Sequence, residues 1–196
     1  VIRRILEYYF LQLCGYEGYD LTKKVLEEKY HVAVCHDLSV YDMQDGKEDR
    51  NKAYSQAAVA VQNLLDEHPS IEVTIDLHRD GVPDNVHLET EINGKKTAKI
   101  MFLNGLCRNS NGDVNDFAQN PNLSDNLAFS LQLQLKAKAY FPELVRHIYL
   151  RAYRYNLHFK PRSLLVEVGA QNNTVAEAKN AMEPLADILY AVLSGK

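Results

Sequence analysis

The chain has 196 residues, of which 46 % are apolar and 24 % charged, and its formal net charge is -4. This composition is typical of a globular protein that buries a substantial core, and we expect a single domain over 1–196. A negative net charge provides no general attraction to nucleic acid or to an anionic membrane surface. Cys14, Cys35 and Cys107 form no C-x-x-C pair, so they indicate neither a disulfide framework nor a cysteine zinc site.

The first half of the chain alternates between helical and strand-like patterns. Helices are predicted over 22–30 and over 49–69, where Pro69 is a stop signal. Short apolar strands are predicted over 32–37 and 71–80. A strand, a helix and a second strand in this order predict two parallel strands that are direct neighbours in one sheet.

The next stretch reads as a hairpin followed by a loop and further strands. Asn93-Gly94 is a strong signal for a two-residue turn, because both residues tolerate positive φ. A polar loop is predicted over 108–122, and two more strands over 146–153 and 163–169.

Two long helices complete the prediction. One begins at Ser124 or Asp125 as its cap and ends before Pro142. The terminal helix begins at Thr174 and is expected to bend or divide at Pro184. The buried stripe of the first helix is predicted to consist of its central leucines, Leu127, Leu131 and Leu135. Together these elements predict an α/β fold, with a mainly parallel mixed sheet and helices on both faces.

Two predicted strand ends carry side chains suited to chemistry. The run "IEVTIDLHRDG" ends in His78, Arg79 and Asp80, and Glu167 lies inside the apolar run "LLVEVG". Ligands and catalytic groups gather at the carboxyl ends of parallel strands. A carboxylate in an apolar strand needs a cationic partner or has a catalytic task, because burying it unpaired costs several kcal/mol. Glu167 is therefore either catalytic or the structural partner of an arginine such as Arg79 or Arg154, and His78 is either functional or a hydrogen-bonded strand-end histidine.

Several motifs in unbroken order resemble one protein family. They are "PSIEVTIDLHRDG", "AKIMFLNG", "NPNLSDNLAFSLQLQLKAKAYFP", "RAYRYN" and "LLVEVGAQNNTVAEA". From about Tyr19 to its end the chain resembles stage II sporulation protein P, a cell-wall hydrolase related to the zinc-dependent N-acetylmuramoyl-L-alanine amidases of the amidase 3 type. The resemblance implies the amidase 3 (phosphorylase/hydrolase-like) architecture.

The resemblance also implies a function and a place in the cell. The expected substrate is peptidoglycan, cut at the amide between N-acetylmuramic acid and the L-alanine of the stem peptide, with stem-peptide cross-links as a further target. The expected setting is wall remodelling at the sporulation septum, with a lytic transglycosylase as partner. The protein would be extracytoplasmic and held by a membrane anchor that this sequence does not contain.

The resemblance assigns roles to individual residues. His78 matches a zinc-binding histidine in D-x-H-R-D, and Glu167 matches the catalytic glutamate in E-V-G. In such an enzyme zinc polarises the amide carbonyl and activates a water, while the glutamate transfers the proton. Residues expected to orient the histidine or to meet the substrate are Arg79, Asp80, Asn122, Asn126, Arg154 and Asn156.

The segment 1–18 departs from the family. Relatives carry a Y-H-T-H-x-x-E type motif there, which supplies a zinc histidine and the zinc glutamate, whereas this segment has no histidine and is expected to hold a short apolar helix. Leu123 also stands where relatives often have tryptophan. Catalytic zinc usually has three protein ligands, so three explanations stay open. In the first, segment 1–18 follows or spans missing residues that carried the zinc ligands. In the second, the domain has lost catalysis and only binds the cell wall or a partner. In the third, another histidine replaces the missing zinc histidine.

Among the other histidines, His36 is the best candidate for a substitute ligand. It lies at the end of the predicted strand 32–37, and the ends of neighbouring parallel strands meet at one edge of a sheet. His87 and His158 are more typical of surface or hydrogen-bonded histidines. Two functions follow, a zinc amidase of peptidoglycan and a non-catalytic domain that binds the wall or assembles with a partner.

Overall fold

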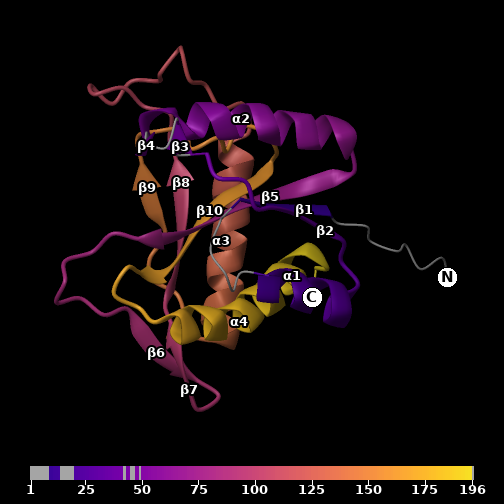
Figure 1. The fold of residues 1–196 in the computed structure, drawn as a ribbon, viewed down its shortest axis with the longest axis vertical. Helices are drawn as coiled ribbons and strands as arrows, with labels where there is room; N and C mark the ends of the chain where they lie inside the picture. The colour runs from indigo at the N-terminus through magenta and orange to yellow at the C-terminus, as the bar shows by residue number, and fades with distance from the viewer. Residues whose placement is uncertain (1–8, 14–19, 42, 45–46, 49, 196) are drawn as a thin grey trace.

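A computed structural model describes residues 9–13, 20–41, 43–44, 47–48 and 50–195 (Figure 1). Its centre is a six-stranded sheet of order β2-β1-β5-β10-β8-β9. In this order the strands are β2 (Val34–Asp37), β1 (Tyr9–Leu13), β5 (Ile71–Asp80), β10 (Arg162–Ala170), β8 (Ile100–Gly105) and β9 (Tyr149–Arg151). Two hairpins lie outside this sheet, β3 (Met43–Gln44) with β4 (Lys47–Glu48), and β6 (Glu89–Ile92) with β7 (Lys95–Ala98).

The central sheet is mainly parallel, as predicted. Neighbouring strands run parallel at every step except between β10 and β8. The long strands β5 and β10 lie in the middle of the sheet. The central part of β10 is almost continuously apolar, as expected for a strand covered on both faces, whereas apolar and polar residues alternate along β5. The two candidate motifs at their carboxyl ends, which contain His78 and Glu167, therefore lie side by side.

Strand β1 occupies a position that the sequence did not predict. It lies between β2 and β5, and its Phe10 pairs with Val34 on one side and with Val73 on the other. The prediction that the strands flanking the second helix are direct neighbours is therefore wrong. The apolar helix expected before Leu13 is a strand over its described part, because a short apolar run fits a buried strand and a helix equally well. The rest of that segment lies outside the described residues.

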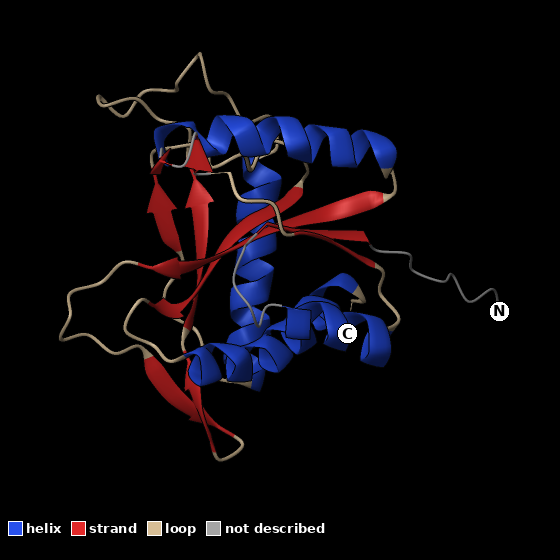
Figure 2. Cartoon of the chain, in the orientation of Figure 1, coloured by secondary structure: helices blue, strands red, loops and turns tan. Residues whose placement is uncertain are grey.

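Helices cover both faces of the sheet (Figures 1 and 2). Helix α2 (Arg50–Glu67) covers one face, and α1 (Asp20–Tyr30), α3 (Leu123–Tyr140) and α4 (Val175–Leu193) cover the other. The main core lies under these three helices and includes Leu164 and Val166 of β10. We call this side the α4 face. Leu165 packs on the opposite side with Leu103 and Leu157, and we call that side the α2 face.

The two long C-terminal helices differ in how well they were predicted. The stripe predicted for α3 is wrong, because Leu131 and Leu135 are exposed, while Phe129 and Leu133 are buried. Its N-cap is Asn122 rather than Ser124 or Asp125. Leucine and other apolar residues alternate along α3, so apolar spacing alone does not select one face.

Helix α4 begins as predicted, with Thr174 as N-cap in a capping box with Glu177, and it continues through Pro184 without division. The predicted hairpin is also confirmed, with Asn93 and Gly94 both at positive φ in the turn between β6 and β7. Among the described helices, none is long and apolar enough to cross a lipid bilayer.

Candidate active site

His78 and Glu167 face each other across two neighbouring strands. Glu167 of β10 is the register partner of His78 of β5, and Leu165 is the partner of Asp76. Register partners in a parallel pair point to the same face, so Asp76, His78 and Glu167 all share the α2 face with Leu165. The structure thus brings together the two residues that the sequence singled out.

Asp76 holds the ring of His78. The Nε2 atom of His78 lies 2.8 Å from Oδ1 of Asp76, two residues earlier on the same strand and face. Burial alone lowers the pKa of His78, but the charge and hydrogen bond of Asp76, with the charge of Glu167, outweigh it and raise that pKa to about 9. Asp76 had no predicted role, although its i, i+2 spacing from His78 in a strand was a usable signal.

Glu167 lies in a setting that favours its protonated form. Its Oε2 atom is buried and has no hydrogen-bond partner among the residues that the structure describes. Burial raises the pKa of Glu167 most, His78 lowers it, Asp80 and Asp76 raise it and Arg146 lowers it, for a net value of about 7. A carboxyl group with this pKa exchanges protons readily at neutral pH, which suits a general acid or base.

Asp80 and Arg79 have structural partners at the end of β5. Arg146 Nη1 lies 2.6 Å from Asp80 Oδ2, and both side chains are mostly buried. Arg79 donates from Nη2 to the carbonyl oxygens of Ala170, at 2.7 Å, and Asn173. Arg79 therefore ties β5 to the turn after β10. Nothing in the sequence marked Arg146 as part of this site.

The turn after β9 meets helix α2 beside the site. Asn156 donates from Nδ2 to the backbone oxygen of Tyr54, at 2.7 Å, and the rings of Tyr54 and Tyr155 are in edge-to-face contact with centroids 5.5 Å apart. Burial is the largest cause that raises the pKa of Tyr54, followed by the charge of Asp76. Arg154 is half-buried in this turn, and its charge adds to burial in lowering the pKa of His158 to about 4.

Asn122 and Asn126, which were expected either to orient His78 or to meet the substrate, bind backbone oxygens near the start of α3. Asn126 is 1 % exposed and donates from Nδ2 to the backbone oxygens of Lys160 and Pro161, at 3.0 and 2.9 Å. Asn122 donates from Nδ2 to the backbone oxygen of His158, at 2.8 Å. Both side chains fasten the start of α3 to the loop before β10. The side chain of Asn126 is buried, which favours a structural role for it over direct contact with a substrate.

His36 does not join His78. Its register partner in β1, Gln12, also pairs with Ile75, which belongs to the core of the α4 face. His36 therefore points to the α4 face, where its Nδ1 lies 2.8 Å from Asp20 Oδ1 of α1. His78 is on the other face, so the structure does not support His36 as a substitute ligand.

The zinc ion implied by the family resemblance can be tested against the side chains around His78. Within the described part of the chain, no group of three His, Cys, Asp or Glu ligand atoms that lie within 4.8 Å of one another includes His78. Glu167 has a free buried oxygen, but one histidine and this carboxylate do not make a three-ligand centre. The described residues therefore do not fit a complete catalytic zinc site.

Sequence comparison places the chain in a family. The sequence model described as stage II sporulation protein P (SpoIIP) matches residues 18–190. The chain belongs to the SpoIIP family. A comparison with curated proteins gave no match.

Solved structures share the fold of this SpoIIP-family chain at low identity. The CwlD amidase from Clostridioides difficile, solved in complex with the GerS lipoprotein, has a TM-score of 0.58 at 12 % identity, covering 96 % of this chain and 97 % of that one. The N-acetylmuramyl-L-alanine amidase Ami1 from Mycobacterium smegmatis has a TM-score of 0.51 at 12 % identity, covering 96 % and 95 %.

The futalosine hydrolase of Helicobacter pylori strain 26695 has a TM-score of 0.56 at 6 % identity, covering 97 % and 99 %. These likenesses confirm the expected amidase and hydrolase architecture. They do not fix the reaction, because one fold carries different chemistries.

Proposed function

We propose that this SpoIIP-family chain is a peptidoglycan hydrolase that cuts the amide between N-acetylmuramic acid and L-alanine. The observation that carries the proposal is the pairing of Glu167 with His78 on one face at the carboxyl edge of the sheet. The buried Oε2 of Glu167 lacks a hydrogen-bond partner among described residues, which favours a working carboxylate over a structural one.

Glu167 transfers the proton in this proposal. With a pKa of about 7, it accepts a proton from the attacking water and returns it to the leaving amine. Asp76 fixes the ring of His78 through a contact of 2.8 Å, so the imidazole keeps one orientation beside the reacting groups. The charges of Asp80 and Arg146 act on the pKa of Glu167 in opposite directions, and neither residue has a proposed contact with it.

The finer details come from the family and are part of the proposal. We propose that His78 is one zinc ligand in the metal-bound protein, with the remaining ligands outside the described residues. Cleavage of stem-peptide cross-links, action at the sporulation septum, a lytic transglycosylase partner and an extracytoplasmic, anchored location rest on the family alone. Remodelling of the cell wall would bring together this second cleavage, the septal location, the partner and the anchor.

The test is digestion of purified peptidoglycan by the wild type and by Glu167→Gln. The amide side chain has nearly the size of the acid but cannot accept the proton, so release of free stem peptides should fall about a hundredfold or more. Glu91→Gln is the matched control, since Glu91 is an exposed strand glutamate, and it should keep full activity. Normal activity of Glu167→Gln would show that Glu167 is not the catalytic group.

Among the described residues, no three-ligand cluster includes His78, and this favours a second candidate, a domain that binds peptidoglycan without cutting it. Sedimentation with insoluble peptidoglycan distinguishes the two candidates. A non-catalytic domain would sediment with the wall and release no stem peptides at any added zinc concentration. Its Glu167→Gln variant would bind peptidoglycan as well as the wild type does.

A further inference from the structure

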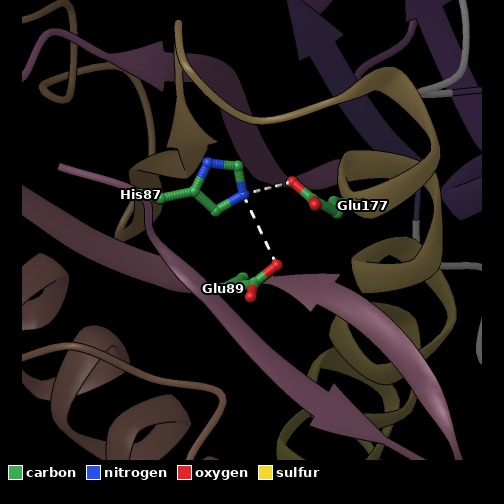
Figure 3. Close-up of side chains that lie close together, drawn as sticks. All are labelled: His87, Glu89 and Glu177. Carbon is green, nitrogen blue, oxygen red and sulfur yellow. Dashed lines mark hydrogen bonds and ion pairs between the residues drawn. The ribbon is translucent and has the colours of Figure 1, made fainter. Parts of the chain in front are cut away.

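A second cluster of ionisable side chains lies away from Glu167 and His78, where the loop after β5 meets the start of α4. The Nε2 atom of His87 is 3.0 Å from Glu177 Oε2 and 3.5 Å from Glu89 Oε2 (Figure 3). The three residues come from a loop, the hairpin strand β6 and helix α4, and Figure 3 shows their polar ends converging on one point. Within the described residues, this is the one group of three His, Cys, Asp or Glu ligand atoms that all lie within 4.8 Å of one another.

These separations fit a small divalent cation. Zinc binds histidine nitrogen and carboxylate oxygen at about 2.0 to 2.2 Å in tetrahedral geometry, which separates neighbouring ligand atoms by roughly 3.3 to 3.6 Å. The observed separations from His87 are 3.0 and 3.5 Å. The two separations from His87 therefore lie within a few tenths of an ångström of those around a zinc ion, and the Glu89 and Glu177 ligand oxygens lie within 4.8 Å of each other.

Glu177 is held in place by other parts of the chain. Its Oε2 accepts hydrogen bonds from the backbone N–H of Thr174, at 3.0 Å, and from Nδ2 of Asn173, at 2.9 Å. Its side chain is 8 % exposed, so it has little freedom to turn away. Donors of this kind orient a carboxylate ligand and reduce the entropy that metal binding must remove.

The other two side chains leave a path to solvent. The side chains of His87 and Glu89 are 42 % and 36 % exposed, which leaves room for a water as fourth ligand. Lys96 also contacts Glu89, with Nζ 3.3 Å from Oε2, but its side chain is 74 % exposed and can move into solvent.

An ion pair without metal is the competing explanation. In that explanation, one positive charge on His87 would face the two carboxylates of Glu89 and Glu177, which leaves one negative charge. Only the exposed Lys96, which contacts Glu89, would balance it among the contacts of the described residues. A divalent cation with neutral His87 balances both carboxylates directly. Nitrogen and carboxylate ligands together suit zinc and its neighbours among the first-row metals better than magnesium or calcium.

We propose that His87, Glu89 and Glu177 bind one divalent transition-metal cation of the zinc type, which pins the loop after β5 to the start of α4. This site is structural and is separate from the proposed amidase reaction. Its effect reaches β5, because the loop that it pins begins directly after His78, Arg79 and Asp80.

The test is calorimetric titration of the EDTA-stripped full chain with zinc chloride, in a His78→Ala background that removes the other proposed ligand. We expect one zinc per chain. Adding His87→Ala should weaken its affinity about a hundredfold or more, and adding Glu89→Gln about tenfold. The matched control is His147→Ala, because His147 is exposed and belongs to no ligand cluster of the described residues. Glu177 is left intact because it caps α4.

Thermal unfolding of the same proteins provides a second readout. Zinc should raise the Tm of the His78→Ala protein and of the protein with His147→Ala added, but not of the protein with His87→Ala added. Two results would overturn the proposal: no zinc binding in the His78→Ala background, which means an ion pair only, or equal affinity with and without His87.

Discussion

Arg146 and Asp80 form an ion pair that joins the segment before β9 to the end of β5, with Nη1 and Oδ2 2.6 Å apart. Asp80 raises the pKa of Glu167 and Arg146 lowers it, so the two charges act on Glu167 in opposite directions. The charge of Arg146 therefore limits the electrostatic effect of Asp80 on the candidate catalytic group.

Replacing one member of this pair should cost more than replacing both. Arg146→Gln leaves Asp80 as a mostly buried carboxylate without its cation, and we expect a loss of about 1 to 3 kcal/mol in the free energy of unfolding. The double variant with Asp80→Asn should recover part of this loss. Urea unfolding of the two single variants and the double variant measures the coupling energy, and additive effects would show that the contact contributes nothing.

Because the pKa of Glu167 is raised in the folded protein, its contribution to the free energy of unfolding should fall as pH rises. Its pKa is about 7 in the folded protein, against about 4.3 in an unfolded chain. The folded state therefore holds its proton more tightly, so the contribution of Glu167 to stability is fully present below pH 4, declines between about pH 4 and 7, and stays low above that.

Glu167→Gln tests this dependence. In metal-free buffer with EDTA, Glu167→Gln should be more stable than the wild type by about 1 to 3 kcal/mol at pH 8 and about equally stable near pH 4. Urea unfolding at both pH values measures it. A structural ion pair at Glu167 predicts the opposite sign at pH 8, because glutamine would then break the pair.

Gly169 should not tolerate a side chain. Its φ is +62°, and a Cβ placed there would lie 2.5 Å from Asn173 Oδ1 and 3.0 Å from Ala98 Cβ. Gly169→Ala should lower the free energy of unfolding by about 2 kcal/mol or more. Gly81→Ala is the control, since a Cβ at Gly81 meets nothing within 4 Å. Equal melting temperatures for the two variants would contradict this account.

Asn126 should matter for stability rather than for substrate binding. Asn126→Ala leaves the backbone oxygens of Lys160 and Pro161 without their donor, which should cost about 2 to 3 kcal/mol. Asn111→Ala, at an exposed loop position, should change little. Chemical unfolding checks the stability. If Asn126→Ala instead weakened peptidoglycan binding at unchanged stability, the side chain would have to reach the substrate.

The sequence predicted the parts of the fold that depend on local signals. Asn93-Gly94 marked the hairpin turn, Thr174 marked the start of α4, and the strand-like runs marked β5 and β10. The pairing of Glu167 with His78 also followed, because both lie at carboxyl ends of parallel strands.

The features that were missed depend on contacts between distant segments. Nothing local shows that the run at Tyr9–Leu13 inserts between two later strands, or that Arg146 reaches Asp80. The exposed side of α3 carries leucines as apolar as those of its buried side, so its orientation is set by partners such as Asn104, which donates to Ser130.

The position of β1 also bears on how the chain folds during synthesis. Among the described strands, the one nearest the N-terminus lies inside the sheet, and one of its partners, β5, is made only after α1, β2 and α2. Of the two described partners of β1, only β2 is available until β5 has left the ribosome, and the edge that β5 will cover keeps exposed N–H and C=O groups that invite wrong pairing. Closing the sheet on β1 joins segments far apart in sequence, so this step should come late in folding.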